Sequence, residues 1–398
     1  MNTGNTVHFP YLHDHHSHVS LYASFEGLPD LAGLDVPAAM RLLGNLPRER
    51  LSLVKGWRTD RLPLGSGHGS MPLDGLPPAI VVNASLHGYA YSPAALPFLS
   101  EMWPEFAENA ADPAWGERNL PRLFVFYGKV AGLDMGKLTS FMERMEGLGI
   151  GSLEDMTLAG EEALAVISGS RFATRIVSWT TPEVYHGLSP ASRSVCVGVK
   201  IFLDGSLGAR SAALDAPYLD GSEGALLFSD PELLRLLAEL AVCQVGLSAH
   251  ALGHKAISQM LRCLKALARD KVTFPSVRLE HAQFIDAEQA RHCKENGIVL
   301  SMQPNFNSDS GDYADRLIPR HRAENDPFRM LIDRAGFIPG HDLVFGSDGM
   351  PHGPEYALRC CQYPDFEGQR LSIEEFEAGY GPAFGIKGEG SVIRIGPA

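Results

Sequence analysis

The sequence predicts an α/β fold, a single (β/α)8 barrel domain over residues 1–398 with a long insertion after its first strand. Short and almost continuously apolar runs alternate with segments of helical periodicity along most of the chain. Continuous apolar runs are typical of strands buried on both faces of a parallel sheet. Eight such runs with helices between them predict a closed barrel, and α/β barrels of more than 250 residues are common as one domain.

The eight predicted strands share this apolar pattern and cover residues 9–14, 150–156, 173–179, 195–203, 245–250, 277–282, 297–303 and 343–349. Helical patterns precede the fifth, sixth and seventh of these strands, over residues 231–243, 254–268 and 286–297. Two connections exceed a normal strand-to-helix loop, the insertion over about residues 20–145 and the segment 204–230. We expect both to reach over the barrel mouth, the insertion as a lid or wall.

The composition excludes some partners and favours one compartment. The 34 basic and 47 acidic residues give a formal charge of −13, which argues against nucleic acid or an anionic membrane as the main partner. The amino-terminal residues have no signal-peptide pattern, and no apolar run approaches the roughly 18 residues of a membrane span. The six scattered cysteines form no Cys-x-x-Cys pair, so we expect reduced thiols and a cytoplasmic protein.

The first predicted strand ends in a cluster of histidines. Residues two apart on an extended strand point to the same face, so His16 and His18 are able to hold one metal ion together. By the same alternation, His13 and His15 are expected on the opposite face, as packing groups or as support for the ligands. A histidine pair alone is a weak signal, because the end of a strand is often polar.

Four further ionisable residues strengthen the prediction of a metal site. Lys200, His250, His281 and Asp348 each lie at or near the carboxyl end of their own predicted strand, where barrel enzymes place their working residues. An ionisable group in such an apolar run is costly to bury unless it is paired or binds a metal.

Several sequence segments resemble the amidohydrolase superfamily, and within it the YtcJ-like branch that includes N-substituted formamide deformylases. The segments are DHHSH (14–18), GVKIFLDGSLGARSAAL (198–214), HALGHKA (250–256), RLEHAQ (278–283), SMQPNF (301–306) and GSDGMPHGP (346–354). The resemblance implies that the metal ligands are His16, His18, Lys200, His250, His281 and Asp348, with the lysine often carboxylated in the family.

The sequence departs from this family in two places. His254 stands where relatives carry an aspartate, which concerns substrate details more than metal binding. Relatives also build a small β-sandwich from both ends of the chain, and here we expect it to be absent or vestigial. Its loss would leave apolar barrel surface for a homo-oligomer interface to cover.

The resemblance and the ligand types together imply a hydrolytic mechanism. A carboxylated Lys200 would bridge two divalent ions, with His16, His18 and Asp348 on the first and His250 and His281 on the second. Catalysis would rest on Asp348, Lys200 and His281: a metal-bound hydroxide attacks, and Asp348 accepts a proton and later returns it to the leaving amine. We expect zinc, while manganese or iron would suit the same ligands. An unmodified Lys200 reaching the barrel rim would instead favour a single ion.

Substrate contacts are predicted from the loops and the ends of strands. The candidates are His87, Asp204, Arg210, Gln303 and Asn305. For residues in the Gly-rich loop after Lys200, ordinary turn chemistry is the alternative. The leading hypothesis is a metal-dependent amidohydrolase that cleaves an amide-type C–N bond of a small molecule. The alternatives are a deaminase or a lactone or ester hydrolase on the same barrel, and a catalytically inactive binding or regulatory protein.

Overall fold

The computed structural model describes residues 5–58, 62, 64, 73–83, 86 and 88–395. The chain divides into two compact units, and each is described by itself. The barrel unit comprises Met1–Val19 and Thr139–Ala398, and the insertion unit comprises Ser20–Leu138.

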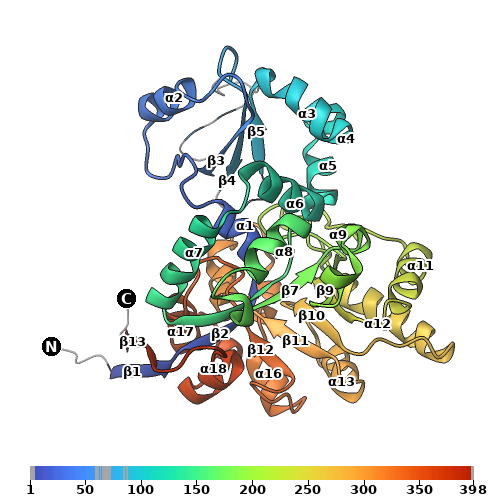
Figure 1. Ribbon diagram of the computed structural model, residues 1–398. Helices are drawn as coiled ribbons and strands as arrows, with labels where there is room; N and C mark the ends of the chain where they lie inside the picture. Colours follow the sequence, from blue (N-terminus) through green and yellow to red (C-terminus); the bar gives the residue numbers. More distant parts are fainter. Residues whose placement is uncertain are drawn as a thin grey trace. The chain divides into compact units, whose positions relative to one another are not determined.

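The barrel unit is built on one parallel sheet of eight strands (Figure 1). The strands are β2 (Leu12–Ser17), β6 (Ile150–Asp155), β7 (Ile176–Thr180), β8 (Cys196–Phe202), β9 (Gly246–Ala251), β10 (Val277–His281), β11 (Val299–Met302) and β12 (Leu343–Phe345). They neighbour one another in chain order from β2 to β12. The backbone N–H of Asp348, just beyond β12, donates to the carbonyl of His16 on β2 at 2.7 Å, which joins the two ends of the sheet. The predicted (β/α)8 barrel and all eight of its strands are therefore confirmed.

Helices separate the barrel strands and cover the outside of the sheet (Figure 1). They are α7 (Met135–Gly147), α8 (Glu161–Ser168), η2 (Ala173–Arg175), α9 (Pro182–Gly187), α10 (Pro190–Arg193), α11 (Asp230–Ala241), α12 (His254–Arg269), α13 (Ala287–Glu295), η3 (Pro304–Ser308), α14 (Asp309–Asp312), α15 (Pro319–Glu324), α16 (Phe328–Asp333), α17 (Pro354–Gln362), η4 (Glu367–Gln369) and α18 (Ile373–Tyr380). The three helices predicted before the fifth, sixth and seventh strands correspond to α11, α12 and α13.

The two ends of the chain pair with each other beside the barrel strands. β1 (Asn5–Pro10) runs antiparallel to β13 (Glu389–Ile395), which forms a separate two-stranded sheet. This pairing was not predicted, because its partners lie at opposite ends of the chain, from Asn5 with Ile395 to Pro10 with Glu389, and neither segment has a continuous apolar run.

The insertion unit has its own sheet and its own core. Its strands are β3 (Ser52–Trp57), β4 (Ala79–Asn83) and β5 (Tyr89–Tyr91), and its helices are α1 (Val19–Ser24), α2 (Val36–Gly44), η1 (Pro93–Ala95), α3 (Leu96–Met102), α4 (Pro104–Asn109), α5 (Pro113–Arg118) and α6 (Leu120–Ala131). Phe106 and Trp115 stack with their ring centroids 5.7 Å apart in an aromatic core. The aromatic residues noted in the sequence thus build a folded unit, and its position over the barrel mouth stays a prediction.

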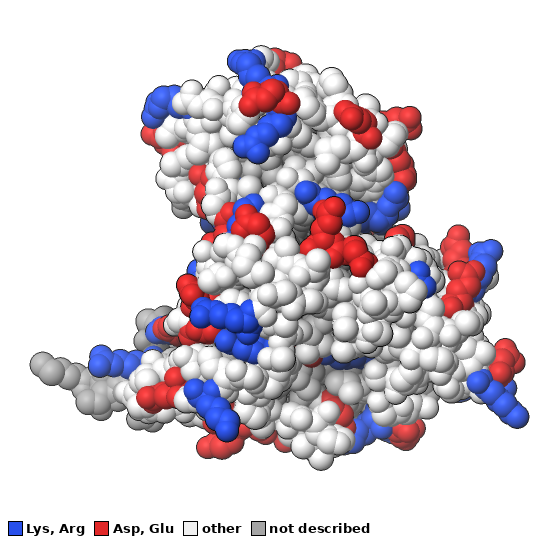
Figure 2. All heavy atoms as spheres, in the orientation of Figure 1, with Lys and Arg blue, Asp and Glu red and all other residues white. Residues whose placement is uncertain are grey.

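The surface carries charges of both signs. On the face shown in Figure 2, acidic and basic side chains are interspersed. Among the described helices, none combines the length and the hydrophobicity that crossing a membrane requires. The six cysteines, all among the described residues, form no disulfide, and Cys196, Cys263, Cys293 and Cys361 are buried.

Candidate metal centre

Two histidines and an aspartate meet at the carboxyl end of the barrel. His16 lies on β2, His18 follows directly after it, and Asp348 follows β12. Asp348 Oδ1 lies 3.0 Å from His18 Nε2 and 3.7 Å from His16 Nε2. One ligand atom from each of the three lies within 4.8 Å of the others, an arrangement able to hold a metal ion.

The other predicted ligands join this cluster from the neighbouring strands. The His281 ring centroid lies 4.9 Å from that of His16 and 4.4 Å from that of His250. Lys200 on β8 is close enough for its charge to lower the pKa of both His16 and His281, although burial lowers the pKa of each imidazole most. The structure therefore brings together all six residues that the sequence singled out.

Acceptor oxygens fix which nitrogen His16 and His281 present to the cluster. The carboxylate of Glu280 accepts a hydrogen bond from His16 Nδ1 at 2.6 Å, and the amide oxygen of Gln303 accepts one from His281 Nδ1 at 2.6 Å. Because these oxygens are acceptors, Nδ1 carries the proton and Nε2 keeps its lone pair. His18 Nδ1 similarly meets the Thr157 hydroxyl at 2.7 Å. These partners orient the imidazoles in the way that ligating histidines require.

Lys200 is the least satisfied member of the cluster. Its side chain is 1% exposed, and Nζ has no hydrogen-bond partner among the described residues. Burial lowers the pKa of this ammonium to about 8. An unpaired buried ammonium costs several kcal/mol, so this setting favours the neutral amine or a modified side chain.

The Asp348 carboxylate is held in its charged form. Burial alone would raise its pKa, but His16 and His18 outweigh this effect and hold the pKa of the carboxyl well below its ordinary value. One carboxylate and two imidazoles are a suitable donor set for a borderline divalent cation.

Three residues at the same place have a strained backbone. His281, Ala282 and Asp348 have φ values of 69°, 46° and 53°, in the left-handed region that non-glycine residues seldom adopt. Such residues cost on the order of 1–3 kcal/mol each and cluster at functional sites. Gly346 allows the close approach of β12 to β2, because a Cβ there would lie 2.3 Å from the backbone nitrogen of His16.

Asp14 stabilises the carboxyl end of β2, which carries His16. Its carboxylate accepts hydrogen bonds from the backbone N–H groups of His16 and Ser347, each at 3.0 Å, and from the Ser347 hydroxyl. This side chain therefore ties β2 to the segment that carries Asp348.

Three of the predicted substrate contacts form hydrogen bonds within the protein, and their contact with a substrate stays a prediction. Both oxygens of buried Asp204 accept backbone N–H bonds from Ala213, Leu252 and Gly253, which join the loop after β8 to the end of β9. Gln303 orients His281, as described above. Asn305 donates to the carbonyls of Ser347 and Met350, at 3.0 and 2.7 Å.

The remaining two candidates differ from these. Arg210 is partly exposed and forms an ion pair with Asp220 at 3.1 Å, so its contact with a substrate stays a prediction. His87 lies outside the described residues.

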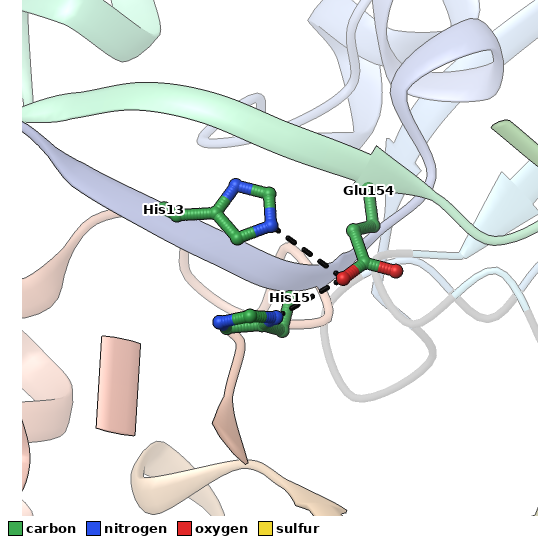
Figure 3. A group of neighbouring side chains, drawn as sticks. All are labelled: His13, His15 and Glu154. Atoms are coloured by element: carbon green, nitrogen blue, oxygen red, sulfur yellow. Dashed lines mark hydrogen bonds and ion pairs between the residues drawn. The ribbon is translucent and has the colours of Figure 1, made fainter. Parts of the chain in front are cut away.

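His13 and His15 do not lie on the opposite face of β2, so that expectation was wrong. Both face Glu154 of β6 (Figure 3). Between Asp14 and Ser17, β2 contains one residue more than the matching stretch of β6, and an extra residue reverses the alternation of side chains. His13 and His15 therefore point into the barrel, as His16 and His18 do.

A chain of buried charges connects the two histidine pairs. Arg278 of β10 donates to Glu154 at 2.8 Å and also to Glu280, which accepts the hydrogen bond from His16. Since β6 and β10 are not neighbours in the sheet, these contacts cross the inside of the barrel. Glu280 and Arg278 were not among the predicted site residues, although two charged residues within the apolar run of a barrel strand were a signal for them.

Comparison with known proteins identifies the family. A family model described as "Amidohydrolase family" matches residues 137–354, more than half of the chain. The chain belongs to the amidohydrolase family. The matched region of this amidohydrolase contains Lys200, His250, His281 and Asp348, while His16 and His18 precede it.

Two curated relatives match parts of this amidohydrolase. "Protein LONG AFTER FAR-RED 3" of Arabidopsis thaliana is 32% identical over 162 residues, which are 38% of this chain and 26% of that protein. "Putative amidohydrolase YtcJ" of Bacillus subtilis is 32% identical over 110 residues, 27% of this chain and 20% of that protein. The match thus spans about a quarter or less of the relatives' own length.

Solved structures share the fold of this amidohydrolase. An uncharacterized metal-dependent hydrolase from Pyrococcus horikoshii superposes with a TM-score of 0.68 and 23% identity, over 93% of this chain and 79% of that one. Its counterpart from Pyrococcus furiosus gives a TM-score of 0.67 and 20% identity, over 93% and 80% of the two chains.

Proposed function

We propose that this protein is a metal-dependent hydrolase that cleaves an amide-type C–N bond of a small molecule. The observation that carries the proposal is the convergence of six ionisable side chains at the carboxyl ends of the barrel strands, in a member of the amidohydrolase family. A structural ion-pair network would pair each of these groups, whereas Lys200 Nζ is buried without a hydrogen-bond partner among the described residues.

The residues present fit a divalent metal, with zinc as the cation that suits them best. His16, His18 and Asp348 would hold one ion, and His250 and His281 would hold a second one. Lys200 in its carboxylated form would supply an anion between them, and a pKa of about 8 leaves part of the amine neutral and able to react with carbon dioxide. When bound, divalent ions at these ligands supply an activated water and polarise a carbonyl oxygen.

Asp348 is the group of this chain best placed to move a proton. Its carboxylate is ionised, as the lowered pKa indicates, and its side chain is 18% exposed, which leaves it open to the mouth of the barrel. Oδ1 would accept a proton during attack on the carbonyl carbon and return it to the leaving nitrogen. Glu280, Thr157 and Gln303 would keep the imidazoles in place through these steps.

The experiment compares metal content and turnover in the wild type and in Asp348→Asn. We expect roughly one or two equivalents of metal in the wild type after metal-supplemented expression, and hydrolysis of some members of an amide panel. Asp348→Asn should lose turnover by a factor of at least about 10² while most of the metal stays bound.

Three outcomes would count against the proposal. Undiminished turnover in Asp348→Asn would refute the proton transfer. Turnover confined to aminated heterocycles or lactones would replace the amide with those substrates. Metal below about half an equivalent, together with no turnover, would favour a catalytically inactive binding protein.

A further inference from the structure

A second group of metal-ligand types lies inside the barrel, below the cluster just described. It consists of His13 and His15 on β2 and Glu154 on β6, with ligand atoms within 4.8 Å of one another (Figure 3). His13 and Glu154 are almost fully buried, and the His15 side chain is 20% exposed. The proposed function uses none of these three residues.

The distances within this group match those around a small metal ion. Glu154 Oε1 lies 3.0 Å from His15 Nδ1 and 3.5 Å from His13 Nε2. Nitrogen and oxygen ligands bound tetrahedrally at about 2.0–2.1 Å are roughly 3.3–3.4 Å from each other. Both imidazoles face the same carboxylate oxygen, as the two converging dashed lines in Figure 3 show.

The surroundings hold the three side chains in this arrangement. The Ser152 hydroxyl lies 2.8 Å from His13 Nδ1, so the other ring nitrogen is the one directed at Glu154. Glu154 Oε2 accepts hydrogen bonds from Arg278 at 2.8 Å and from Trp179 at 2.6 Å. These bonds orient the carboxylate so that Oε1 faces the imidazoles of His13 and His15. Support of this kind from outside the ligands is typical of metal sites.

We propose that His13, His15 and Glu154 form a second divalent-cation site, suited to Zn²⁺ or Co²⁺ and separate from the centre above it. Two imidazoles and one carboxylate are the donors that such borderline cations prefer, whereas Mg²⁺ and Ca²⁺ prefer oxygen ligands. Three protein ligands leave a fourth position for water, on the side where His15 is partly exposed. Because Arg278 already compensates part of the Glu154 charge, this site should bind more weakly than the upper one.

The test counts metal equivalents in the full chain after chelation, with Co²⁺ followed by visible absorption and Zn²⁺ by elemental analysis. His15→Gln removes one donor, while its amide N–H is still able to bond Glu154. We expect this variant to bind one equivalent fewer than the wild type. The matched control, His8→Gln, changes an exposed histidine that pairs with Glu389 on the two-stranded sheet, and it should bind as the wild type does.

A variant of the upper cluster distinguishes failure of this proposal from failure of the proposed function. His16→Asn/His18→Asn removes two of the three ligands proposed for the first upper ion. The metal that this variant still binds should fall by about one equivalent on adding His15→Gln. If the upper cluster binds no metal, the wild type and this double variant bind the same number of metal equivalents. The loss of one equivalent in His15→Gln still tests the lower site. Ser152→Ala, which removes only the positioning hydroxyl, should weaken the lower site by roughly 10–100-fold.

Equal stoichiometry and affinity in the wild type and His15→Gln would overturn the proposal, since His13 and His15 would then serve only as hydrogen-bond donors to Glu154. Circular dichroism checks the fold of every variant. If the double variant does not fold, the comparison of the wild type, His15→Gln and His8→Gln decides the question alone.

Discussion

Glu280→Gln tests how far the buried charges stabilise both the barrel and the candidate centre. Glu280 is fully buried, binds Arg278 and Ser248 through Oε1, and accepts the His16 hydrogen bond through Oε2. Burial would raise its pKa, but Arg278 and His16 hold it well below the ordinary value, so the group is an anion. Neutralising one partner of a buried pair costs about 3–5 kcal/mol.

The lower end of this range applies, because Glu154 still compensates Arg278 in the variant. A loss of about 3 kcal/mol should lower the melting temperature of the metal-free protein by roughly 4–5 °C, because the unfolding entropy is about 2.1 cal/mol/K per residue. The amide still accepts the bond from His16 Nδ1, but without the negative charge that makes this imidazole a stronger ligand. We therefore expect metal affinity to fall by roughly 10–100-fold.

The assay combines thermal and chemical denaturation of the metal-free protein with titration by Co²⁺ in a chelator buffer. Glu143→Gln is the matched control, because Glu143 pairs with Arg171 at 2.7 Å while both side chains are more than half exposed. Such a surface pair contributes about 0–1 kcal/mol. If Glu280→Gln is no less stable than Glu143→Gln, the buried network does not stabilise the fold, and unchanged affinity would refute its role in orienting His16.

Three further perturbations follow from single positions. Gly346→Ala places a Cβ 2.3 Å from the His16 nitrogen and should cost roughly 3 kcal/mol in denaturant titrations, whereas Gly44→Ala, with nothing within 4 Å, should change stability by less than about 1 kcal/mol. Burial raises the pKa of Asp309 to about 7, so the folded state keeps a proton that the unfolded state loses. As the pH rises from about 4 to about 7, this group should therefore lower the free energy of unfolding by roughly 1.4 kcal/mol per pH unit. Asp309→Asn should remove this contribution from the pH profile of unfolding, and an unchanged profile would exclude Asp309 as its source. Lys200→Met should weaken metal binding at the upper cluster and leave the His13, His15 and Glu154 group unaffected. It should also raise the free energy of unfolding of the metal-free protein by roughly 1–4 kcal/mol, because it removes an unpaired buried ammonium; a loss of stability would contradict this.

The sequence predicted the barrel because its strands are buried on both faces, and that burial leaves a continuous apolar run in each of them. It also predicted which residues meet at the mouth, because the carboxyl ends of parallel strands share one end of a barrel. It could not predict the extra residue in β2, since the bulge exists only relative to the pairing with β6. Strict alternation therefore placed His13 and His15 on the wrong face.

The hydrogen-bond partners of the candidate metal ligands also could not be predicted from the sequence. The position of Gln303 after β11 is readable from the sequence, but its hydrogen bond with His281 is not, because its rotamer depends on packing across the barrel. The pairing of β1 with β13 and the sheet of the insertion unit depend on long-range contacts that no local pattern records.

Arg278 connects the two halves of the barrel interior. Its guanidinium is fixed between Glu154 below and Glu280 above, and these carboxylates raise its pKa despite burial. A cation bound beside Glu154 would compete with Arg278 for the negative charge of that carboxylate. The ion pair between Arg278 and Glu280 would then become stronger. The Glu280 carboxylate would then accept less strongly from His16, so occupancy of the lower site should weaken binding at the upper one. Linkage requires the effect to be reciprocal, and titrating Co²⁺ into the wild type and His15→Gln would show it as tighter upper-site binding in the variant.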